Sequence, residues 1–254
     1  MKEILVRADD LGYSEAVNYG LAKTLREGII RSVGIMVNMP YTKHGYELIK
    51  DLDVCKGLHT NICVGRPLCN PSDVKSICDE NGNLRASRDY RESYKKGIDF
   101  VDLDEVIMEI EAQYEAFVKL TGEKPHYFEG HAVMSDNFNK GLEIVAKRYD
   151  CEYLAASFNG PVKFRNTYLV ASMDSVRPDY DPFESLKREV LRTDLKDNER
   201  VMFVCHPGYL DDFILRTSSL TVARTKEVEM AVSEETKKWL KDNDVRIITY
   251  DDLR

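Results

Sequence analysis

The sequence predicts a single α/β domain in which mostly parallel strands and helices form a β/α barrel-like fold. Short apolar runs alternate along the 254 residues with stretches of helical periodicity, as in repeated βα units. Acidic or imidazole side chains follow four of these runs at the downstream end, the edge where parallel sheets and barrels place their ligands. No repeat or shift in composition divides the chain, so we expect one catalytic domain over residues 1–254.

The first hundred residues are expected to contain three strands and two helices. The strands are predicted at 3–8, 32–37 and 54–62, and the helices at 15–27 and 42–52. Ser14 is a suitable N-cap for the first helix, and Gly28 a suitable end. Residues 63–100 carry several Gly and Pro and no clear periodicity, which predicts a loop-rich insertion. Such a length without regular structure is usually functional or mobile.

The rest of the chain continues the alternation. Helices are predicted at 103–121, 137–149, 183–191, 223–231 and 233–243. Strands are predicted at 126–129, 154–157, 201–205 and 245–250, and residues 158–182 are expected to be irregular. The barrel should therefore contain six to eight mostly parallel strands.

Composition excludes several classes of partner. The net charge is −8 and no basic stripe interrupts it, which argues against a nucleic-acid partner or an anionic membrane surface. No apolar run approaches the roughly 20 residues that span a bilayer. The six cysteines include no Cys-x-x-Cys pair, so we expect reduced thiols in a cytoplasmic protein. The N-terminus leads directly into a strand, without the apolar region of a signal peptide.

The first candidate site residues are two adjacent acids, Asp9 and Asp10, at the end of the first strand. Successive strand residues point to opposite faces, so one carboxylate can bind a metal while the other takes a proton. The alternative is that the pair starts a turn or caps the following helix.

Three histidines follow other predicted strands. His59 and His131, together with Asp10, would supply three metal ligands and leave positions open, as catalytic sites do. Two imidazoles and one carboxylate suit zinc or another transition metal, whereas magnesium prefers oxygen ligands. His206 precedes Pro207 and is a candidate general acid, because imidazole titrates at about 6.5.

Each of these histidines, taken alone, is also compatible with a structural position in the core or in a turn. Two more histidines, His44 and His126, lie within a predicted helix and before a predicted strand. We expect both to be structural.

Four motifs in order make the chain resemble the YdjC-like carbohydrate deacetylases, which include the chitooligosaccharide deacetylases. The matching segments are Ala8-Asp9-Asp10-Leu11-Gly12, Gly57-Leu58-His59 with Gly65-Arg66-Pro67-Leu68, Glu129-Gly130-His131, and Cys205-His206-Pro207-Gly208. The resemblance implies a distorted β/α barrel of the glycoside hydrolase/deacetylase type. It also implies hydrolysis of the acetyl group of an N-acetylated amino sugar or short oligosaccharide.

The resemblance also implies roles for individual residues. Asp10, His59 and His131 would hold one divalent metal ion, Asp9 would be the general base and His206 the general acid. The family's usual cofactor is magnesium, which disagrees with the preference for zinc that the ligand types suggest. The expected partner is a small sugar, and a homodimer, the commonest assembly, is compatible with the sequence.

The chain departs from the family pattern around the third motif. Glu129 stands where members typically carry Asp, and Val133 and Ser135 stand where they carry further histidines. These changes are expected to alter the sugar pocket. Two other functions stay open: a metal phosphoesterase with the same ligands, or a sugar-binding protein on a decayed deacetylase scaffold. Other hydrolase signatures, such as His-x-His, Asp-x-Asp and Gly-x-Ser-x-Gly, are not found at the strand ends.

Overall fold

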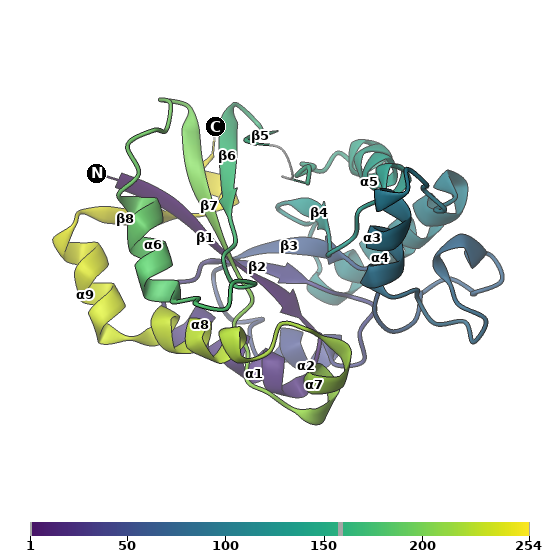
Figure 1. Cartoon of the computed structure of the whole chain (residues 1–254), viewed down its shortest axis with the longest axis horizontal. Helices are drawn as coiled ribbons and strands as arrows, with labels where there is room; N and C mark the ends of the chain where they lie inside the picture. Colours follow the sequence, from purple (N-terminus) through teal and green to yellow (C-terminus); the bar gives the residue numbers. More distant parts are fainter. Residues whose placement is uncertain (1, 157–159, 254) are drawn as a thin grey trace.

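The computed structural model describes residues 2–156 and 160–253. One mostly parallel sheet runs in the order β4-β3-β2-β1-β7-β6-β5, with β8 paired to β1 (Figure 1). The strands are β1 (Lys2–Leu11), β2 (Ser32–Ile35), β3 (Cys55–Thr60), β4 (Phe128–Gly130), β5 (Val162–Phe164), β6 (Thr167–Ser172), β7 (Glu199–Cys205) and β8 (Val245–Ile248). The curved sheet and its surrounding helices confirm the predicted distorted β/α barrel.

The strand β1 is the centre of this sheet. It pairs in parallel with β7 on one edge. On β1, residues 2–5 pair with β8 and residues 7–11 pair with β2. Within the described residues, β5 and β6 form the one antiparallel pair. Every strand that leads into a candidate site residue is therefore parallel to its neighbours, so their downstream ends meet at one edge.

Helices cover the sheet. They are α1 (Glu15–Glu27), α2 (Thr42–Glu47), α3 (Ser87–Lys95), α4 (Leu103–Thr121), α5 (Asp136–Arg148), α6 (Pro182–Val190), α7 (Asp212–Thr217), α8 (Val222–Val232) and α9 (Glu234–Asp242), with short 3-10 turns η1 (Lys75–Ile77) and η2 (Tyr250–Asp252). In Figure 1, α1 lies beside α8 and α4 beside α5, and both pairs are in contact. No helix among the described residues is both long and apolar enough to cross a membrane.

Capping side chains fix the helices that the sequence predicts best. The Ser14 hydroxyl accepts a hydrogen bond from the Val17 N–H at the start of α1. The Asp102 side chain caps α4, and Gly122 ends it with a φ of +79°, a conformation that favours glycine. Both helices therefore have the predicted bounds.

The structure corrects the prediction in four places. Residues 158–182 were expected to be irregular, but 162–164 and 167–172 form β5 and β6; residues 158 and 159 lie outside the described residues. The helix α7 was not predicted, and the loop-rich insertion contains α3 and η1. Residues 154–156 of the strand predicted at 154–157 form no strand; one isolated bridge, between Phe128 and Tyr153, lies just before them, and residue 157 is outside the described residues. These elements are short, so their sequences carry too few periodic positions to reveal them.

Candidate active site

The backbone of β1 is irregular where it carries the two acids. Its register with β2 shifts between Ala8 and Leu11, and Asp10 has a φ of +79°. Such a bulge changes the direction of the side chains that follow it. Left-handed backbone is uncommon outside glycine, so the surrounding pairing must hold Asp10 in place. Both Asp9 and Asp10 are buried, at 1% and 0% exposure.

Two imidazoles face Asp10 from neighbouring strands. His59 lies near the end of β3, and His131 directly follows β4. The Asp10 Oδ1 atom is 3.3 Å from His59 Nε2 and 3.2 Å from His131 Nδ1. The same two ring nitrogens are 2.9 Å apart. One carboxylate oxygen and two imidazole nitrogens thus converge on one point.

This donor set fits a divalent metal ion. The Asp10 Oδ1 atom is buried and has no hydrogen-bond partner, while Oδ2 accepts a hydrogen bond from Arg224 at 2.7 Å. An unpaired buried carboxylate oxygen is costly unless a cation or donor satisfies it. The donor atoms of Asp10, His59 and His131 all lie within 4.8 Å of one another. Nitrogen and oxygen donors at this spacing suit a transition metal such as zinc.

The electrostatics of the cluster also favour a cation. Burial alone would raise the pKa of Asp10, but Arg224 and His131 hold this pKa well below its usual range. Burial alone would lower the pKa of both imidazoles. Glu129 and Asp9 instead raise the pKa of His59 well above normal, and Cys63 and Asp10 raise that of His131 to about 9. The negative potential that retains protons here would equally attract a metal ion, which competes for the same nitrogens.

A second acidic group lies behind His59. The donor atoms of Asp9, His59 and Glu129 also lie within 4.8 Å of one another. The Arg7 guanidinium already pairs with both carboxylates of this group: its Nη2 atom is 2.6 Å from Asp9 Oδ2 and 3.7 Å from Glu129 Oε2. Glu129 hydrogen-bonds His59 Nδ1. Glu129 therefore orients the ring whose Nε2 faces Asp10, as carboxylates beside metal-binding histidines commonly do.

His206 directly follows β7, at the same edge of the sheet. Its backbone N–H donates to Glu227 Oε2 at 2.6 Å, and its carbonyl accepts from Arg224 at 3.3 Å. The residue is partly exposed, but its Nδ1 atom is enclosed and has no hydrogen-bond partner. Burial lowers the pKa of His206 to about 4, so the ring is neutral at neutral pH. The structure thus places all five predicted site residues at one edge of the sheet.

Two charged residues of α8 that support this site are not among the candidates predicted from the sequence. Arg224 binds Asp10, and Glu227 also accepts a hydrogen bond from the Tyr180 hydroxyl at 2.8 Å. Burial raises the pKa of Glu227 to about 7. Arg224 and Glu227 lie on the same helix face as the buried Val228 and Ala231. Charges within a buried helical stripe were the signal that could have revealed them.

The two departures after the third motif have structural contacts. Val133 is 4% exposed and belongs to the hydrophobic core. The Ser135 hydroxyl caps α5 by accepting from the Phe138 N–H, and it donates to Asp99 at 2.9 Å. Replacing Ser135 with histidine would remove a helix cap, which typically stabilises by about 1 kcal/mol. The expectation that both positions mainly shape a sugar pocket finds no support in these contacts.

Removal of Arg224 should destabilise the protein strongly. The variant Arg224→Met leaves the Asp10 carboxylate buried without its guanidinium partner, which typically costs about 3–5 kcal/mol. Denaturant unfolding would measure the loss. The matched control is Arg216→Met, because Arg216 pairs with Asp212 in an exposed contact and should cost under about 1 kcal/mol. Equal stability of the two variants would contradict the role given to Arg224.

Comparison with known proteins places this chain in a family. A sequence model described as YdjC-like protein matches residues 3–242. The chain belongs to the YdjC-like family. A relative named carbohydrate deacetylase 2, from Listeria innocua, is 28% identical over 99% of this chain and 98% of its own length. A carbohydrate deacetylase from Thermoanaerobacter pseudethanolicus is 28% identical over the full length of both chains.

Solved structures support the fold of this YdjC-like chain. A candidate cellobiose-phosphate cleavage protein from Enterococcus faecalis superposes with a TM-score of 0.80 at 21% identity, covering 98% of both chains. A family 4 acetyl xylan esterase from Clostridium thermocellum, in complex with a cobalt ion, gives a TM-score of 0.52 at 10% identity, over 98% of this chain and 88% of the esterase. At these identities the likeness concerns the fold.

Proposed function

We propose that this YdjC-like protein is a metal-dependent carbohydrate deacetylase that removes the acetyl group from an N-acetylated amino sugar or short oligosaccharide. The names of the full-length relatives support the reaction class. The observation that carries the proposal is the buried Asp10 Oδ1 atom, which lies 3.3 Å from His59 Nε2 and 3.2 Å from His131 Nδ1 at one sheet edge. Asp9 and His206 are the proposed proton-transfer groups.

Asp10, His59 and His131 would hold the ion. A divalent ion held there would supply Lewis-acid chemistry, which would polarise the acetyl carbonyl and make a water molecule more acidic. Asp9 is the proposed general base. Arg7 binds the Oδ2 atom of Asp9. The Oδ1 atom of Asp9 is buried without a hydrogen-bond partner, so it is available to accept the proton of the attacking water.

The proton that leaves the water must reach the amine. Water adds to the acetyl carbon, the C–N bond breaks, and the sugar nitrogen takes a proton, which yields acetate and a free amino group. His206 is the proposed donor of that proton. Because its ring is neutral at rest, His206 would first have to take up the proton that Asp9 removes from the water, and would then pass it to the amine. Glu227 and Arg224 hydrogen-bond the backbone of His206 and so fix the position from which its side chain extends.

Two arguments about the identity of the metal disagree. Family resemblance suggests magnesium, whereas two imidazole nitrogens and one carboxylate oxygen favour zinc or another transition metal. We give more weight to the donor atoms, because they are the groups that contact the ion. Activity should therefore be highest with zinc, manganese or cobalt, and lower with magnesium.

The direct test is acetate release. A panel of N-acetylated mono-, di- and trisaccharides is assayed with magnesium, zinc, manganese and cobalt in turn. We expect at least one sugar to release acetate, and chelation of the ion to abolish the release. Phosphate release from sugar phosphates, without acetate release, would favour a metal phosphoesterase. Binding of sugar and metal without either product would indicate a decayed scaffold that binds sugars.

The insertion at 63–100 is proposed to border the sugar pocket within a single catalytic domain. Its first residues are fixed beside the site: Glu109 accepts hydrogen bonds from the N–H groups of Leu68 and Cys69, and the Cys63 thiol contacts His131. Farther along, residues 79–83 form an exposed turn.

Substrate should therefore protect the insertion from proteolysis. Limited digestion with and without an N-acetylated sugar would show slower cleavage in 63–100 when the sugar is bound. Shortening the exposed turn at 79–83 should raise KM with a smaller effect on kcat. The same cleavage rate in both states, together with an unchanged KM, would exclude contact between this segment and the sugar.

A further inference from the structure

A second group of metal-binding side chains lies at the opposite end of the sheet. Cys55 begins β3, His126 precedes β4, and Asp251 lies in η2 after β8. Cys55 and His59 are separated along β3 by four residues, which at about 3.3 Å each is roughly 13 Å. The group is therefore separate from the proposed catalytic centre.

We propose that Cys55, His126 and Asp251 form a second site for zinc or a similar transition metal. Their donor atoms, a thiol sulfur, an imidazole nitrogen and a carboxylate oxygen, lie within 4.8 Å of one another. Zinc binds these three donor types at about 2.0–2.3 Å, so small side-chain rotations would complete the coordination. The sulfur donor distinguishes this site chemically from the nitrogen and oxygen donors of Asp10, His59 and His131.

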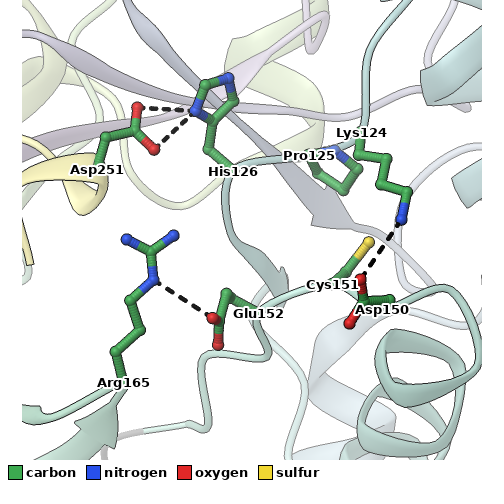
Figure 2. A pocket seen from close by; sticks show the side chains of 8 residues that line it. All are labelled: Lys124, Pro125, His126, Asp150, Cys151, Glu152, Arg165 and Asp251. Carbon is green, nitrogen blue, oxygen red and sulfur yellow. Dashed lines mark hydrogen bonds and ion pairs between the residues drawn. The ribbon is translucent and has the colours of Figure 1, made fainter. Parts of the chain in front are cut away.

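A cavity gives an ion access to two of these donors. It has a volume of about 430 Å³, and His126 and Asp251 line it together with Lys124, Cys151 and Arg165. Figure 2 shows the His126 ring and the Asp251 carboxylate turned towards each other at the edge of this cavity. A fourth ligand, such as water or a small anion, could bind from the cavity side.

The three donors already lie in contact with one another, and an ion would replace these contacts. His126 Nδ1 is 2.8 and 2.9 Å from the two carboxylate oxygens of Asp251, so both donors already face each other. The Cys55 thiol is buried beside the same carboxylate. A metal ion placed among them would neutralise Asp251 and, by displacing the thiol proton, form a thiolate ligand.

An ion at this site would join three segments distant in sequence. It would link the start of β3, the segment before β4, and η2 near the C-terminus. Because these segments come together only in the folded chain, binding should stabilise that state by mass action. The expected role is therefore structural: the ion attaches the C-terminal segment to the end of the sheet remote from the proposed catalytic centre.

Cobalt titration tests this site directly. The full chain is freed of metal by chelation and titrated with Co²⁺, while the ultraviolet band of thiolate-to-cobalt charge transfer is recorded. We expect the band in the wild type and its loss in Cys55→Ser. Two matched thiol variants should keep it: Cys151→Ser, from the same cavity, and Cys63→Ser, beside His131. Cobalt binding without this band, or loss of the band in Cys63→Ser instead, would overturn the proposal.

A second measurement does not depend on the buried cysteine. His126→Gln and Asp251→Asn change partly exposed side chains and should each weaken cobalt binding at this site by at least about 10-fold. In a His59→Ala/His131→Ala background, which removes the proposed catalytic ligands, zinc should still raise Tm. It should no longer do so when Asp251→Asn is added. A Tm that zinc leaves unchanged in that background would also overturn the proposal.

Discussion

Replacement of Asp9 by asparagine is expected to lower kcat for acetate release by roughly 10²–10⁴-fold, the usual contribution of a positioned general base. Asparagine keeps the shape of the side chain but cannot take a proton from water. Metal content should not change, because Asp9 and Asp10 are bound to different arginines. Arg7 pairs with Asp9, and Arg224 with Asp10.

Three measurements test the effect of the Asp9→Asn substitution. Steady-state kinetics give kcat and KM, elemental analysis gives the metal content, and circular dichroism checks the fold. Arg7 keeps a partner in Glu129 at 3.7 Å, so the fold should persist. A kcat close to that of the wild type would assign the base to another group. Loss of the metal would instead mean that the roles of Asp9 and Asp10 are exchanged.

Alanine at His59 or at His131 should remove the ion of the proposed catalytic centre. Each substitution deletes one of the three donors Asp10, His59 and His131, and the two donors left give an incomplete set. Elemental analysis should show a loss of about one equivalent, and acetate release should fall to background. The measurement is best made in a Cys55→Ser background, so that the proposed second site does not contribute metal.

The control for this experiment is His44→Ala. His44 lies in α2 and contacts Asn18 through Nδ1 at 3.2 Å, outside the cluster. Its removal should leave the metal content and acetate release unchanged. If His59→Ala or His131→Ala keeps the wild-type metal content in the Cys55→Ser background, that histidine is not a ligand.

The sequence predicts where the candidate residues lie, because parallel strands bring their downstream ends to one edge. Asp9, His59, His131 and His206 could be identified from the strands that precede them. The bulge at Asp10 could not be predicted, because its φ depends on the register between β1 and β2. Arg224 was missed for a related reason, since its partner Asp10 is remote in sequence and only the tertiary fold brings them together.

The secondary structure also divides into elements that the local sequence predicts and elements that depend on tertiary pairing. The helices α1 and α4 have caps and enough periodic positions to define both ends from local sequence. The strand β6 depends on pairing with β7, and β5 depends on β6, so neither has a strong local signal. Likewise, His126 was expected to be only structural, because Cys55 and Asp251 approach it only after the sheet has formed.

The left-handed backbone at Asp10 bears on the order of events during the maturation of the protein. Pairing of β1 with β2 and β7 must already be in place to keep a non-glycine residue in this conformation. His131 comes from a strand synthesised much later than Asp10. The ion proposed at Asp10, His59 and His131 should consequently bind after folding, at a site that is already formed. Protein prepared without metal should then be folded and inactive, and adding the ion should activate it.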